Sequence, residues 1–260
     1  MSVTTVAILQ PTFLPWAGWF DLADQSDLLI VLDDVAFSKQ SWQQRNRIRT
    51  PEGLSYATVP VRTSGRLGQR ILDTELANTL FAEKLLKTIS ANYARAPYFA
   101  RYYPEFCDVL RSSASTGMLA ALNGGLIEWL LSQLGITTPR VLSSELAVEG
   151  TRGELVAKLC ERVQASRYLS PAGAESYLLE DRAAFDSRSI SVELHVYEHP
   201  VYGQCFKPFV PYASVLDMLM NEGDTAGEIL RSGRRASRPL GVEGAQGGQT
   251  SAEQASIAER

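Results

Sequence analysis

Two histidines offer the clearest acid–base chemistry in this chain, and one of them stands at the predicted end of a strand. His199 follows the alternating segment 191–198 and directly precedes Pro200, so we expect it at a strand exit. His195 lies within that segment, with Leu194 beside it, which favours a role in the strand itself. Histidine titrates near neutral pH and serves as a general acid or base. We predict that His199 is the principal titrating group of the site, unless it only hydrogen-bonds a loop.

Polar side chains follow the ends of the first two predicted strands. The apolar run 3–9 ends at Gln10, and the run 28–32 ends at Asp33 and Asp34, after which residues 38–47 read SKQSWQQRNR. Planar amides and guanidinium groups fix ligands through paired hydrogen bonds, although a solvated loop is the alternative. Ligands of open α/β sheets bind beyond the carboxyl ends of the strands. We predict that a catalytic group and a substrate-binding group meet there. The catalytic group is His199, Asp33 and Asp34; the substrate-binding group is Gln10, Trp16, Lys39, Gln44, Arg45, Asn46, Arg47 and Tyr202.

Positive charge is concentrated in residues 39–70, although the whole chain carries a net charge of −4. Seven basic residues stand there against the single acidic residue Glu52. Such a patch can hold phosphate or carboxylate, and the glycine-containing segment 63–70 could close over an anion. The segment lacks the GxxxxGK[ST] and GxGxxG spacings, so an ordinary surface loop is the alternative. We expect a small-molecule substrate that is anionic or nucleotide-activated.

Metal and nucleophilic cysteine chemistry have little support in the sequence. The three cysteines show no CxxC spacing, and neither histidine begins an HExxH pattern, so we predict no metal site. A hard cation held by carboxylates stays open, because it leaves no spacing signature. Cys205 lies near His199, but no third group orients the pair. The identity of any cofactor is left open.

Strands and helices alternate along the chain, which favours a parallel or mixed sheet flanked by helices. The predicted strands cover residues 3–9, 28–32, 55–61, 141–146, 167–170 and 191–198. The predicted helices cover residues 78–93, 97–112, 119–134, 153–164, 175–185, 212–221 and 225–231. After residue 231 the composition turns to Gly, Ala, Gln, Ser and Glu without apolar periodicity. We therefore predict one α/β domain over residues 1–231 and a flexible tail over residues 232–260.

Composition narrows the class of protein. The chain has 260 residues, of which 45% are hydrophobic, so a sizeable core can form. The acidic balance argues against a nucleic-acid binder. No apolar run reaches the length of a membrane helix, and residues 1–30 contain no Lys or Arg to start a secretory signal. We expect a cytoplasmic protein, and its oligomeric state is left open.

Several motifs, in order over roughly residues 5–225, resemble the WbqC-like protein family. They are QPTFLPW from Gln10, LDDVAFSK from Leu32, SWQQRNRI from Ser41, NY from Asn92, APYF from Ala96, Asn123 with IEWL from Ile127, SSEL from Ser143, YLS from Tyr168, YEHPVY from Tyr197 and NEG from Asn221. Two positions depart from the family pattern. Leu9 stands where the family usually has histidine, and residues 170–174 replace a glycine-rich turn with SPAGA.

The resemblance implies a bacterial intracellular protein from surface-polysaccharide or specialised-metabolite assembly, without specifying a reaction. We expect a transferase that modifies an amine or hydroxyl of a sugar or small metabolite with an activated donor. A nucleotide-dependent ligase forming an amide or ester, and a non-catalytic binding protein of the same pathway, are the alternatives. If the family histidine is catalytic, Leu9 means that its role is lost or has passed to His199.

Overall fold

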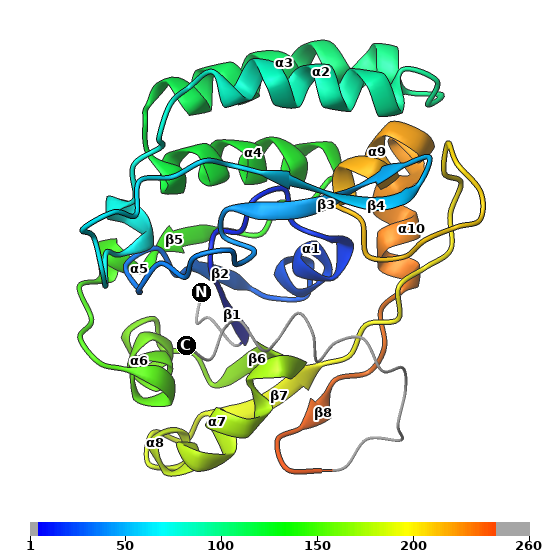
Figure 1. Cartoon of the computed structure of the whole chain (residues 1–260). Coiled ribbons are helices and arrows are strands. Elements are labelled where there is room, and N and C mark those ends of the chain that lie inside the picture. The colour runs from blue at the N-terminus through cyan, green and yellow to red at the C-terminus, as the bar shows by residue number, and fades with distance from the viewer. Residues whose placement is uncertain (1–4, 243–260) are drawn as a thin grey trace.

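A computed structural model describes residues 5–242, which form an α/β fold around a six-stranded mixed sheet (Figure 1). The strand order is β5-β2-β1-β6-β7-β8. All neighbouring pairs are parallel except β7 and β8, which are antiparallel. The strands are β1 (Thr5–Leu9), β2 (Leu28–Val31), β5 (Arg140–Leu142), β6 (Arg167–Pro171), β7 (Ser191–His195) and β8 (Arg238–Pro239). The predicted fold class, a mixed sheet flanked by helices, is confirmed.

The central strand β1 is apolar at nearly every position because both faces of the sheet are covered. All five of its residues are buried. Ala7 and Leu9 belong to one hydrophobic cluster, whereas Val6 and Ile8 belong to another. Successive side chains of a strand point to opposite faces, so the two clusters lie on the two sides of the sheet.

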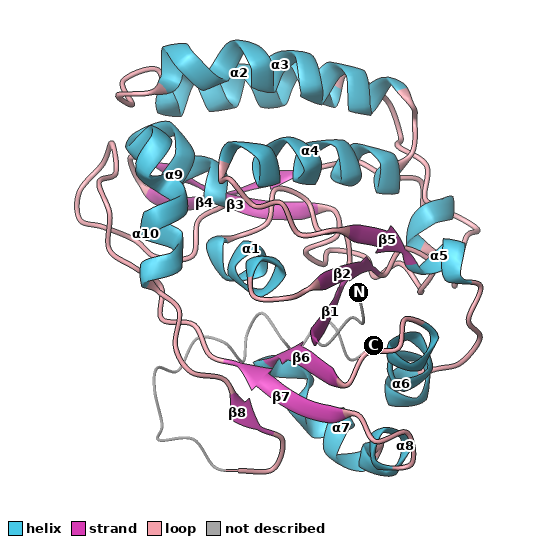
Figure 2. Cartoon of the chain, turned by 180° about the vertical axis from the view of Figure 1, so that it is seen from behind, coloured by secondary structure: helices cyan, strands magenta, loops and turns pink. Residues whose placement is uncertain are grey.

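Helices contribute residues to both clusters (Figure 2). The larger cluster includes residues of α1, α2, α3, α4, α9 and α10, and the smaller one includes residues of α6, α7 and α8. The helices are α1 (Ala17–Asp24), α2 (Phe81–Tyr93), α3 (Phe99–Ser115), α4 (Leu119–Gln133), α5 (Ser143–Leu146), α6 (Arg152–Arg162), α7 (Glu175–Glu180), α8 (Arg182–Asp186), α9 (Val215–Glu222) and α10 (Ala226–Ser232). Short 3-10 turns are η1 (Ile71–Asp73), η2 (Ala172–Ala174) and η3 (Gly223–Thr225). None of the helices within residues 5–242 is long and apolar enough to cross a membrane.

A separate two-stranded hairpin, β3 (Arg45–Thr50) with β4 (Gly53–Thr58), lies outside the main sheet. The sequence predicted a strand over residues 55–61, near β4, and a polar pocket floor or a solvated loop over residues 38–47, so β3 was missed. The sequence of β3 is RNRIRT, which carries too little apolar alternation to identify a strand. Arg49 is nonetheless buried, because its guanidinium donates to the carbonyl oxygens of Thr50 and, at 2.8 Å, Pro208.

The segment after α10 packs against the sheet as far as the structure describes it. β8 pairs with β7, and Leu240 is buried. Arg234 forms ion pairs with Asp21 and Asp24 of α1. Residues 232–242, which the sequence assigned to a flexible tail, therefore contribute to the folded structure. The remainder of that predicted tail, residues 243–260, lies outside the described residues.

Candidate functional site

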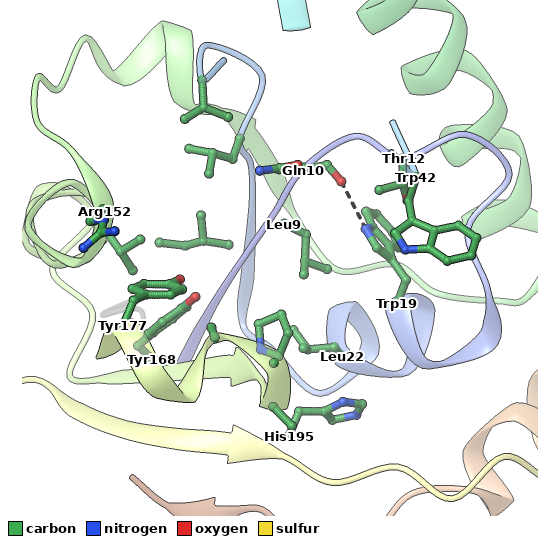
Figure 3. A pocket seen from close by; sticks show the side chains of 18 of the residues that line it. Leu9, Gln10, Thr12, Trp19, Leu22, Trp42, Arg152, Tyr168, Tyr177 and His195 are labelled. Atoms are coloured by element: carbon green, nitrogen blue, oxygen red, sulfur yellow. Dashed lines mark hydrogen bonds between the residues drawn. The ribbon is translucent and has the colours of Figure 1, made fainter. Parts of the chain in front are cut away.

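A large cavity opens at the carboxyl ends of β1, β2, β6 and β7, where ligands of open parallel sheets bind. Its volume is about 1510 Å³. The wall combines apolar and aromatic side chains with polar and charged ones. Figure 3 shows Tyr168, Tyr177 and Arg152 on one side of the open space and Trp19 and Trp42 on the other.

Buried amide groups fix the segments that follow β1 and precede β3. Asn123 of α4 is fully buried and donates from Nδ2 to the carbonyl oxygens of Pro11 and Gln43, both at 2.8 Å. The Gln43 side chain donates to Gln10 Oε1 at 2.8 Å. Trp19 Nε1 donates to the Gln10 carbonyl oxygen at 3.2 Å (Figure 3). The Gln10 side chain is thereby held in one orientation on the cavity wall.

Two hydrogen-bond donors of residues in the cavity wall lack a partner. The Gln10 side-chain NH₂ has no hydrogen-bond partner among residues 5–242. Trp42 Nε1 is also unpartnered within this described part of the chain. Both residues line the cavity, but Trp42 Nε1 is itself buried, so the Gln10 NH₂ is the donor that an oxygen acceptor of a bound molecule would reach.

His195, rather than His199, is the histidine that lines this cavity. It is the last residue of β7, and its Nε2 lies 2.7 Å from Oδ2 of Asp21 on α1. Asp21 is fully buried and also accepts from Gln25 Nε2 at 2.7 Å and Arg234 Nε at 3.0 Å. The alternating pattern continues to residue 198, so the sequence did not place His195 at the end of the strand. The strand end at His195 was the missing signal.

His199 lies in an aromatic cluster beside the cavity. Its ring is stacked on Trp16 with centroids 6.3 Å apart, and the Tyr212 ring lies at 5.1 Å. Its Nδ1 is 3.0 Å from the Pro200 carbonyl oxygen. Burial lowers the pKa of His199 to about 4, against a smaller opposing effect of that carbonyl. The structure places no contact between His199 and the predicted partners Asp33 and Asp34, among the interactions of residues 5–242.

The two aspartates after β2 face a short helix. Asp33 is buried and accepts hydrogen bonds from Ser144 N at 3.1 Å and Ser144 Oγ at 2.8 Å. Ser143 Oγ lies within hydrogen-bonding distance of both Asp33 and Asp34. Asp34 lines the cavity and Asp33 does not. Asp33 thus binds the first turn of α5, whereas Asp34 is accessible to a ligand.

The structure brings some of the predicted substrate-binding residues to the cavity and leaves others elsewhere. Gln10, Trp16 and Asn46 line it, and Asn46 Nδ2 also donates to the Leu14 carbonyl oxygen at 2.8 Å. Those outside the lining are Lys39, Gln44, Arg45, Arg47 and Tyr202. Their roles in binding stay predictions.

The residues outside the lining have partners of their own. Arg45 lies over the Tyr56 ring at 4.4 Å, and Arg47 lies over the Trp42 ring at 5.4 Å. Gln44 donates to the Val59 carbonyl oxygen at 3.3 Å. These contacts hold the β3–β4 hairpin and the loop before it.

Tyr202 belongs to a second buried polar group centred on Asp217. Its hydroxyl donates to Asp217 Oδ2 at 2.6 Å, and Gln204 Nε2 donates to the same oxygen at 2.8 Å. Burial raises the pKa of the Asp217 carboxyl, and burial beside Asp217 raises that of Tyr202. This network joins the loop after β7 to α9.

The basic residues of segment 39–70 lie outside the cavity lining, and several form ion pairs. Arg62 and Arg66 pair with Glu75, and Arg70 pairs with Asp73. The arginines that do line the cavity come from other segments. They are Arg152, which pairs with Glu180 at 3.4 Å, and Arg238, which pairs with Glu175.

The described residues show neither an activated cysteine nor a cluster of metal ligands at this site. Burial raises the pKa of Cys160 to about 12, and burial followed by the charge of Asp217 raises that of Cys205. A thiol with a raised pKa is a poor nucleophile at neutral pH. Within residues 5–242 no group of three or more His, Cys, Asp or Glu side chains is arranged to hold a metal ion.

Comparison with known proteins identifies the family of this chain. The model of the WbqC-like protein family matches residues 10–229. The chain is also 35% identical over 227 residues to a protein of Mycobacterium tuberculosis (strain ATCC 25618 / H37Rv) titled "Uncharacterized protein Rv1507c", covering 87% of this chain and 97% of that protein. No solved structure matches the chain. Both the family match and the mycobacterial relative cover nearly all of the described fold, and the chain therefore belongs to the WbqC-like family.

Proposed function

We propose that the protein is a cytoplasmic biosynthetic transferase, which modifies an amine or hydroxyl of a sugar or small specialised metabolite with an activated donor. The observation that carries this proposal is the size and position of the cavity. Its volume of about 1510 Å³ exceeds the range of about 300–1,000 Å³ that is usual for sites holding one small ligand. A cavity of this size accommodates a donor and an acceptor together.

The lining suits sugar-like or heterocyclic molecules. Trp16, Trp42 and Tyr177 are partly accessible and provide flat apolar surfaces. The free NH₂ of Gln10 would fix an oxygen atom of a ligand near those surfaces. Polar groups placed among apolar and aromatic side chains are the usual means of orienting a small molecule.

Arg152 is the group that would meet an anionic, nucleotide-activated donor. It lies at the first turn of α6, and its ion pair with Glu180 is exposed, with both side chains about two-thirds accessible. An exposed ion pair contributes little stability, so a phosphate could replace Glu180 at small cost. Arg238 is less available because it is held by Glu175 on both nitrogens.

Isothermal titration with nucleotide sugars, acyl-coenzyme A and ATP tests the proposal. We expect binding of a nucleotide sugar or acyl-coenzyme A, followed by transfer to an amine- or hydroxyl-bearing acceptor. Binding of ATP with product formation that consumes it would replace the transferase by a ligase. Absence of binding by all three donor classes would contradict the proposal and favour a binding protein.

A pair of matched variants checks that the cavity is the site. Ala172 in η2 lines the cavity, whereas Ala100 on α3 is exposed and lies outside its lining. We expect Ala172→Trp to weaken donor binding at least tenfold by filling the space. Ala100→Trp, which adds the same bulk elsewhere, should bind as the wild type does.

A further inference from the structure

A buried histidine–aspartate pair borders the cavity, and the sequence did not point to it. His195 Nε2 is 2.7 Å from Asp21 Oδ2. The side chain of Asp21 is completely inaccessible and that of His195 is 7% accessible. The pair joins the carboxyl end of β7 to α1, two elements that are far apart in the sequence (Figure 1).

The groups around Asp21 determine which imidazole nitrogen carries the proton. Gln25 Nε2 and Arg234 Nε both donate to the Asp21 carboxylate. Arg234 is itself fixed by Asp24, to which Arg231 also donates. A carboxylate surrounded by donors acts as an acceptor, so the neutral imidazole donates its Nε2–H to Asp21.

The other imidazole nitrogen is then a free base. His195 Nδ1 has no hydrogen-bond partner among residues 5–242, and the residue lines the cavity. The Tyr197 ring, stacked on the imidazole at 5.9 Å, limits its rotation. An oriented imidazole with one nitrogen bound to a carboxylate and the other directed to substrate is the arrangement that general-base catalysis requires.

We propose that His195 Nδ1 is the general base that deprotonates the acceptor, with Asp21 as its positioning residue. This inference rests on the proposed function. The acceptor nitrogen or oxygen attacks the electrophilic carbon of the donor and forms the new bond, while its proton passes to His195 Nδ1. The bond between that carbon and the leaving group breaks, and its electron pair stays with the leaving group. The imidazolium, which Asp21 stabilises, returns the proton to the leaving group or to water.

The tautomer is measurable without knowing the substrate. The chain has two histidines, so long-range ¹H–¹⁵N correlation spectra of the protein contain two imidazoles, which His199→Gln assigns. At a pH where His195 is neutral we expect the Nε2–H form. In Asp21→Asn we expect a mixture of both tautomers, which a merely structural role of Asp21 would not produce. A dominant Nδ1–H form in the wild type would overturn the proposal.

Activity measurements test the catalytic role of His195 once the titration with donors has identified a donor and an acceptor that react. We expect His195→Gln to lower kcat by roughly 10²–10⁴, the usual contribution of a general base, with a much smaller change in KM. Glutamine can still donate to Asp21, so this variant should fold. His195→Ala provides a second test, because added imidazole should restore part of its activity.

The outcomes separate the base assignment from the proposed function. Loss of activity in His199→Gln with full activity in His195→Gln would return the role to His199 and overturn the inference alone. Absence of transfer by a folded wild type with any donor, even with the Nε2–H tautomer present, would overturn both the proposed function and the inference that rests on it.

Discussion

Two histidines four positions apart have opposite environments. His195 ends β7 and faces a buried carboxylate, whereas His199 is surrounded by aromatic rings. The sequence predicted His199 at the strand end, whereas β7 ends at His195. Alternating residues such as Tyr197 obscure the end of the strand, because they continue the pattern beyond the last paired residue.

The environment of His199 predicts a pH-dependent stability. Burial lowers its pKa to about 4 in the folded protein, whereas the ordinary value of 6.5 applies to the unfolded chain. Between these pH values the unfolded chain binds more protons, so the free energy of unfolding decreases as the pH falls from 6.5 to 4. Above pH 6.5 the imidazole is neutral in both states, so this contribution to the free energy of unfolding is fully present. When the pH has fallen to about 4, roughly 3 kcal/mol of the free energy of unfolding has been lost.

Urea unfolding of the wild type and His199→Gln between pH 4 and pH 7 measures this effect. We expect a smaller decrease for the variant, whatever its stability at pH 7, since carboxylates titrate equally in both proteins. Parallel curves for the two proteins would show that His199 does not contribute.

At the scale of elements, apolar patterns predicted the five parallel strands of the main sheet and most helices, while the strands β3 and β8 and the helix α1 were missed. Buried strands such as β1 and β2 consist of continuous apolar residues, which a sequence shows directly. The arginines of the hairpin strand β3 have partners outside that strand: Arg49 donates to the Pro208 carbonyl oxygen, and Arg45 and Arg47 lie over the Tyr56 and Trp42 rings. Those partners lie up to 159 positions away and carry no local signal.

Asp33 connects β2 to α5, and its loss should affect stability. Three donors of Ser143 and Ser144 lie within 3.1 Å of its carboxylate. We expect Asp33→Ala to lower the free energy of unfolding by about 2 kcal/mol, because buried donors lose their acceptor. Asp34→Ala, at the neighbouring half-buried position, is the control and should cost clearly less. Equal losses in chemical denaturation would contradict the assignment of Asp33 to the helix.

At the scale of the whole molecule, chain segments from both ends form the site. The cavity wall includes Leu9 and Gln10 after β1 as well as Ala236 and Arg238 near β8. The position of a site at the carboxyl ends of the first strands was predictable from the fold class. The contributions of Asp21 and of the segment after residue 231 could not be predicted. An aspartate between apolar residues and an arginine in a polar stretch both resemble ordinary surface residues.

Substitutions of two neighbouring arginines test how much the segment after residue 231 contributes to stability. Arg234 pairs with the buried Asp21, whereas Arg235 pairs with the exposed Glu198. We expect Arg234→Gln to lower the free energy of unfolding by about 2 kcal/mol, since a buried carboxylate loses a charged donor. Arg235→Gln should cost less than about 0.5 kcal/mol. Similar melting temperatures for both variants would show that the contact with α1 contributes little.

The same contact has a consequence for synthesis of the protein on the ribosome. Asp21 is made early, but its partner Arg234 and the wall residue Arg238 emerge more than two hundred residues later. Domains fold as their residues leave the exit tunnel, so the sheet can assemble before the cavity is complete. The nascent chain therefore completes the cavity wall only after Arg238 has emerged, and a nascent chain arrested before residue 234 holds the Asp21 carboxylate without its arginine.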